Sequence, residues 1–117
     1  MKKRNKYFCY AGSALLLFMA IFHGSGFNFV KASIESSNAD SFLKDIVPAL
    51  FAHPSIHLMG LTAFGLLSTT MEQPRKVLVL LALLIFVDAA LGFYLGGLIP
   101  GAFLSSAAIL FILAYRL

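Results

Sequence analysis

The chain has few charged residues and a single cysteine, and each shortage excludes a class of protein. Only 12% of its 117 residues are Asp, Glu, Lys or Arg, about half the share in an average soluble domain, so a water-facing surface would not be covered. The lone Cys9 excludes an intramolecular disulfide, a Cys-x-x-Cys redox pair and an all-thiolate metal site. No Glu lies inside a long apolar run, which excludes ferritin-like di-iron chemistry with its Glu-x-x-His motifs.

What the chain does have is apolar residues, which make up 60% of it and gather in four runs. The runs cover about residues 7–23, 48–70, 77–95 and 99–115. Each has roughly the 17–25 residues that a helix needs to cross a hydrocarbon core about 30 Å thick. The sequence therefore predicts an all-α integral membrane protein, with residues 1–117 forming a single transmembrane domain built as a four-helix bundle.

The distribution of positive charge predicts how the bundle is oriented. With a cytoplasmic N-terminus, seven of the nine Lys and Arg lie inside, namely Lys2, Lys3, Arg4, Lys6, Arg75, Lys76 and Arg116. The positive-inside rule then places both termini in the cytoplasm of a bacterial-type inner membrane, with the protein crossing it several times. Because these residues flank apolar runs and form no stripe, we expect no nucleic acid partner despite the net charge of +4.

Residues 24–45 form the one polar stretch, and we expect them to be an external loop. Apolar residues recur every fourth position from Phe42 to Leu50, which predicts a short interfacial helix from about Ser41 that leads into the second span. Asp45 is placed to cap the second span. The alternative is that this stretch is a solvated tether.

Small residues in three of the spans predict close helix packing. In a bilayer, helices approach one another closely where side chains are small. The candidates are Gly60, Ala63 and Gly65 in the second span, Ala89 and Gly92 in the third, and Gly101 with Ser105 or Ala102 with Ser106 in the fourth. The short connections between spans also predict that helices consecutive in the sequence are antiparallel neighbours.

Asp88 is the most informative single residue, because it is the one acid inside a span. An Asp at the centre of a transmembrane helix costs about 2.5–3.5 kcal/mol on insertion scales, so it needs a partner, a proton or water. It lies seven residues from Leu95, about 10 Å at 1.5 Å per residue. Asp88 is therefore expected in the external half of the bilayer.

All three histidines are expected in the same layer as Asp88. His23 closes the first span, and His53 and His57 lie in the external half of the second. Their i, i+4 spacing puts His53 and His57 on one face of a helix. The sequence therefore predicts a His/Asp cluster of His23, His53, His57 and Asp88 as the ligand or metal site.

Pro54 is expected to open the second span beside these histidines. A proline inside a helix removes one backbone donor and displaces the carbonyl four residues earlier, here that of Leu50. Freed backbone groups at membrane depth are tolerated where they line a cavity or gain new partners. We therefore expect a helix kink at Pro54 and a polar pocket open toward the external side.

Several functions fit such a cluster. Imidazole and carboxylate suit zinc, copper, iron or nickel, and axial imidazoles from two helices would hold one haem b, although three histidines are too few for two. The cofactor, if any, is unknown, and the same residues also fit a structural clasp between helices. Binding of a ligand or metal is the leading hypothesis, and no catalytic residue is expected.

Two further classes remain open. A non-catalytic accessory or assembly subunit would use its apolar faces to join a larger membrane complex or a homo-oligomer within the lipid bilayer. In length, span number and an intramembrane acid, the chain resembles the small multidrug resistance transporters, which implies a small proton-coupled transporter. That family places its acid, a Glu, in the first helix, whereas here the acid is Asp88 in the third.

Overall fold

The computed structural model describes residues 1 and 3–116, and every regular element in them is helical. The elements are α1 (Lys3–Gly24), α2 (Phe27–Glu35), α3 (Ser41–Ser68), α4 (Arg75–Leu91), the π-helical turn η1 (Gly92–Gly96) and α5 (Leu98–Arg116). Four helical segments are long and apolar enough to cross a membrane, namely Lys3–Glu35, Ser41–Ser68, Arg75–Gly96 and Leu98–Arg116. The predicted all-helical class and the four long apolar helices are therefore confirmed for the described residues.

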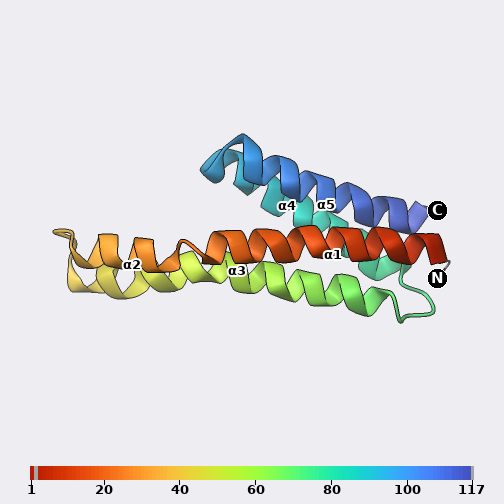
Figure 1. Ribbon diagram of the computed structural model, residues 1–117, viewed down its shortest axis with the longest axis horizontal. Coiled ribbons are helices and arrows are strands. Elements are labelled where there is room, and N and C mark those ends of the chain that lie inside the picture. Colours follow the sequence, from red (N-terminus) through yellow and green to blue (C-terminus); the bar gives the residue numbers. More distant parts are fainter. Residues whose placement is uncertain (2, 117) are drawn as a thin grey trace.

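α1 lies between α3 and α5 (Figure 1). α1 packs along α3 and along α5, and α4 packs mainly on α5 and only sparsely on α3. The start of α1 and the end of α5 lie at the same end of the bundle (Figure 1). The sparse packing of α3 on α4 matters for function, because the candidate site lies between these two helices.

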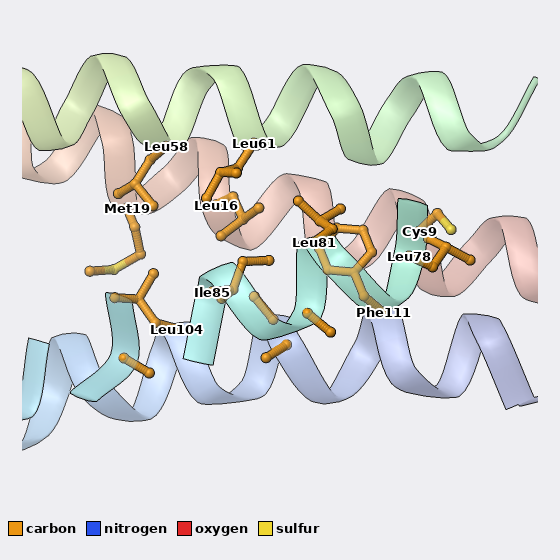
Figure 2. Packing of buried hydrophobic residues seen from close by; sticks show 14 of the residues in the cluster. Cys9, Leu16, Met19, Leu58, Leu61, Leu78, Leu81, Ile85, Leu104 and Phe111 are labelled. Carbon is orange, nitrogen blue, oxygen red and sulfur yellow. The ribbon is translucent and has the colours of Figure 1, made fainter. Parts of the chain in front are cut away.

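A buried aromatic ring marks the tightest part of the core. Phe111 on α5 is fully buried and lies beside the other apolar side chains of the core (Figure 2). A Cβ atom added at Gly12 would lie 2.9 Å from this ring, and one added at Gly65 would lie 2.8 Å from it. Gly65 therefore lets helices approach closely as predicted, whereas no described atom lies within 4 Å of a Cβ added at Gly60.

The expectation of a loop over 24–45 is wrong for much of this segment, which is helical as α2. The helix expected from about Ser41 does begin there, and it leads into the second span without a break as α3. The cap is Asp40 and not Asp45, because Asp40 has the extended backbone of an N-cap and its side chain accepts the Leu43 N–H at 2.9 Å. Packing of α2 against α3 supports the added helical turns.

The hairpin of α2 and the first half of α3 extends beyond the turn between α4 and α5 (Figure 1). Large apolar side chains on it are exposed, among them Phe29, Phe42 and Leu50 at 77%, 67% and 64%. We call residues 27–50 the projecting hairpin. The candidate site lies where α3 passes from this hairpin into the bundle.

Candidate functional site

A hydrogen bond between His57 and Asp88 links α3 to α4. The His57 Nε2 lies 3.0 Å from the Asp88 Oδ2, and the two side chains are 38% and 21% exposed. With an ionised carboxylate as acceptor, the Nε2–H of the imidazole donates. The partner that Asp88 needs inside a span is therefore His57, on a helix that otherwise contacts α4 only sparsely.

His53 lies one helical turn before His57 on the same face of α3. The two imidazole rings are nearly parallel, with 7° between their planes and 6.4 Å between their centroids. His53 itself is exposed. The i, i+4 spacing thus brings the two rings together as predicted, but only His57 reaches Asp88 among the bonds formed by the described residues.

The surface beside His57 is open on the side away from the core. Residues three apart are neighbours on a helix surface, and Gly60 follows His57 at this spacing. A Cβ added at Gly60 would meet no described atom within 4 Å. Space is therefore available at Gly60, one turn along α3 from His57.

His23 makes a different contact and does not join the pair. Its Nε2 lies 2.9 Å from the Phe51 carbonyl oxygen, to which it donates, and its ring stacks on that of Phe51 with centroids 4.3 Å apart. Phe51 precedes His57 by six residues, about 9 Å along a helix. The four candidate residues therefore divide into two groups, with His23 holding α1 to α3.

The sequence indicated this region of α3 through Pro54, but it missed Phe51. Pro54 lies inside α3, which continues through it, so the expected kink is still only a prediction. Because Pro54 has no N–H, the Leu50 carbonyl loses its helical donor, yet the carbonyl that His23 reaches is that of Phe51. The position of Pro54 therefore identifies the turn of α3 in which a backbone hydrogen bond is lost. Which carbonyl oxygen in that turn accepts a bond from His23 depends on how α1 packs against α3.

The described residues do not assemble a metal centre. Among residues 1 and 3–116, no three His, Cys, Asp or Glu side chains are grouped so that they could hold a metal ion. A bis-histidine haem needs imidazoles from two helices, and His23, the one histidine outside α3, uses its Nε2 for Phe51. The geometry thus favours a hydrogen-bonded pair over a metal cluster.

The end of α4 next to the site departs from regular helix. The Gly92 N–H bonds to the Asp88 carbonyl oxygen, and the π-helical turn η1 begins there. A Cβ added at Gly101 on α5 would collide with the Phe93 ring, so the glycine makes room for this ring. Single π turns occur frequently at functional sites, and no pattern in the sequence predicts this one.

Fold and site together define an all-helical protein whose four apolar helices are compatible with multiple membrane crossings and whose second and third apolar helices, α3 and α4, are joined by a His–Asp pair. Comparison with protein-family models, with curated proteins and with solved structures gives no match. The function must therefore be argued from the pair itself.

Proposed function

We propose that the chain is a small integral membrane protein that binds a ligand from the lipid phase at the His57–Asp88 pair. The observation that carries this proposal is the 3.0 Å bond of a pair whose imidazole is still 38% exposed. Ionisable groups inside spans are rare and usually mark substrate or ion pathways. A pair that served only to join α3 to α4 would have no need of an imidazole that is exposed to this degree.

The chemistry of the pair restricts the ligand. With the Nε2–H of His57 given to Asp88, the Nδ1 atom remains: it accepts a hydrogen bond in the neutral ring and donates one in the protonated ring. A hydroxyl group on a lipid-soluble ligand would donate to the Nδ1 atom of the neutral ring, and a carbonyl group would accept from the Nδ1–H of the protonated ring. Quinol and quinone head groups have this chemistry, so we take them as the ligand class.

Other functions gain less support. Metal or haem binding would require His23 or further ligands to move into the pair, because the described residues bring no three ligating groups together. Proton-coupled transport would require a polar path from Asp88 toward the termini. The core in that direction is mostly apolar, with Leu81, Leu16 and Phe111 among its side chains. Its buried hydroxyls carry no charge and include those of Ser13, Thr62 and Ser68.

One observation favours a second candidate, an accessory subunit of a larger membrane complex. The projecting hairpin exposes Phe29, Phe42 and Leu50 beyond the α4–α5 turn. Exposed apolar side chains that gather on one surface are typical of interaction sites. Co-purification of a larger complex in mild detergent would support this candidate.

We also propose that the membrane is a bacterial-type inner membrane with both termini in the cytoplasm. The end of the bundle that holds the termini carries most of the basic residues, including Lys3, Lys6, Arg75 and Arg116, whereas Lys31 and Lys44 lie toward the other end. A Ser36→Cys variant should react with a membrane-impermeant maleimide added outside intact cells, because Ser36 is exposed while the native Cys9 is buried.

Imidazole NMR tests the ligand proposal, because the chain has only three histidines to resolve. The full chain, labelled with ¹⁵N-histidine in lipid nanodiscs, is titrated with ubiquinone-2 and with its quinol. The expected result is a change at the Nδ1 signal of His57, a smaller one at His53 and none at His23. Asp88→Asn should weaken the response, because the amide no longer holds the ring as an anionic acceptor does.

The same samples separate the alternatives. A His57→Phe variant should abolish binding of both probes, and His23→Gln is the matched control that should not. Titration with Zn²⁺ or with haem that shifts two or more histidines while the quinone shifts none would overturn the proposal in favour of metal binding. No response to any probe, in a protein whose three histidine signals show it to be folded, would also overturn it.

A further inference from the structure

A polar cavity lies at the end of the bundle away from the His57–Asp88 pair, beside the start of α1 and the end of α5. It is an open cavity of about 550 Å³ between α1, α4 and α5. Two arginines, Arg75 and Arg116, line it, and none of its described lining residues is acidic. Among residues 1 and 3–116 neither arginine takes part in a salt bridge, so the described lining carries positive charge.

Tyr115 holds one of these arginines in place. The Arg75 Nε donates to the Tyr115 hydroxyl at 2.9 Å, the Arg75 Nη2 donates to the same oxygen, and the guanidinium carbon lies 4.8 Å from the centroid of the ring. A guanidinium has five N–H donors, so donors remain after these two bonds. Arg75 is thus pre-positioned for an anion at little cost in side-chain entropy.

Asn5 adds an unsatisfied acceptor to the cavity wall. This residue is only 8% exposed, and its Nδ2 donates to the Ala114 carbonyl at 2.9 Å. Its Oδ1 is buried with no hydrogen-bond donor among the described residues. A buried acceptor without a partner is destabilising, so a ligand hydroxyl that reached this atom from the cavity would be stabilising.

An apolar groove continues from the cavity along α4 and α5. It has a volume of about 180 Å³ and shares Leu78, Tyr115 and Arg116 with the cavity. Its remaining lining is apolar and includes Val79, Leu83, Phe86 and Ile112. A charged cavity at the end of the helices thus opens directly into a groove that follows the helices.

We propose that the cavity and the groove together bind one anionic glycerophospholipid. Arg75 and Arg116 bind the phosphate, a head-group hydroxyl donates to the Asn5 Oδ1, and one acyl chain lies in the groove between α4 and α5. Basic pockets between transmembrane helices on the cytoplasmic side are typical lipid head-group sites. A free phosphate would leave the groove empty, and a choline head group would bring a cation to the arginines, so a lipid with a glycerol head group fits best.

Native mass spectrometry of the full chain tests this site. The protein is equilibrated with equimolar dioleoylphosphatidylglycerol and dioleoylphosphatidylcholine in detergent, and the retained adducts are counted. At about 1 kcal/mol for each basic residue, we expect phosphatidylglycerol to be preferred about tenfold or more. The Arg75→Gln/Arg116→Gln variant should lose this preference, and the single Arg116→Gln variant, which keeps the Arg75–Tyr115 contact, should lose part of it.

The matched control removes the same charge from the same end of the bundle. Lys3 and Lys76 do not line the cavity, so Lys3→Gln/Lys76→Gln should keep the preference. Leu83→Trp fills the groove and should reduce retention of phosphatidylglycerol while leaving both arginines intact. Equal retention of both lipids by the unmodified chain, or equal loss in the lysine and arginine variants, would overturn the proposal. Competition by glycerol 1-phosphate as strong as that by the lipid would overturn the acyl-chain assignment and leave a phosphate site.

Discussion

The two halves of α3 share one continuous helix but have opposite surroundings. All of its residues are described, and none of residues 41–57 is buried. In the second half the buried residues are Leu58, Leu61, Thr62, Gly65 and Ser68. The first half contacts α2 in the projecting hairpin and the end of α1 at Phe51, whereas the second half packs on α1 around the Phe111 ring.

This difference suggests how stability and binding are divided along the helix. Segments with few buried apolar contacts open at lower free energy than the core does, and binding residues are commonly drawn from such segments. His57 is the last residue before the buried half begins. The proposed binding site therefore lies at the boundary, where one side of the helix is fixed and the other is accessible.

The largest expected effect is a glycine substitution in the buried half. A Cβ added at Gly65 would lie 2.8 Å from the Phe111 ring and would also collide with the Ser13 hydroxyl. Gly65→Ala should therefore lower the free energy of unfolding by about 1–3 kcal/mol, as overpacking of a core does. Denaturation followed by circular dichroism in detergent micelles measures this loss.

The matched control is the same substitution in the open part of the helix. Gly60→Ala adds a methyl group where no described atom lies within 4 Å. It should be neutral or stabilising by up to about 1 kcal/mol, because alanine is the better helix former. Equal losses from the two variants would contradict the division of α3 into a packed and an open face.

A double-mutant cycle across the boundary has the next largest expected effect. His57→Leu and Asp88→Leu each leave one polar group without its partner, whereas the double variant leaves neither. The coupling energy should be about 0.6–1.7 kcal/mol, the range for hydrogen bonds between membrane helices. The cycle between His53 and Asp88 is the control and should give a coupling near zero, since no bond joins them. A coupling of equal size in both cycles would mean that the pair is not specific.

Much of the fold follows from the sequence because lipid imposes a simple rule. Apolar runs of sufficient length must become helices that satisfy their own backbone groups, and this rule gives the four long helices. It says nothing about the polar stretch 24–45, where helix formation depends on contacts between α2 and α3 that are distant in sequence. The sequence also does not show that Gly65 lies in a helix contact and Gly60 does not, because only the packing places Gly65 against Phe111.

The candidate site was predictable to the same degree. Spacing along one helix puts His53 and His57 on one face, and the need of Asp88 for a partner points toward the histidines. Because the prediction used only the expected depth in the membrane, it also placed His23 in the cluster with His53, His57 and Asp88. Which histidine meets Asp88, and which meets the Phe51 carbonyl, depends on how α1 and α4 are placed around α3, and no local pattern encodes that placement.

The smallest expected effect concerns His23, which lies at the same boundary but on α1. His23→Phe keeps a ring to stack on Phe51 and removes one hydrogen bond to its carbonyl. We expect a loss of about 0.6 kcal/mol in the free energy of unfolding, the average for such bonds in a membrane protein, and an unchanged response of His57 to ubiquinone-2. Loss of that response in His23→Phe, but not in a variant equally destabilised in the core, would place His23 in the binding site. An unchanged response would show that the His23–Phe51 contact positions α3 without taking part in binding. Recognition of the ligand would then need only His57 on α3 and Asp88 on α4.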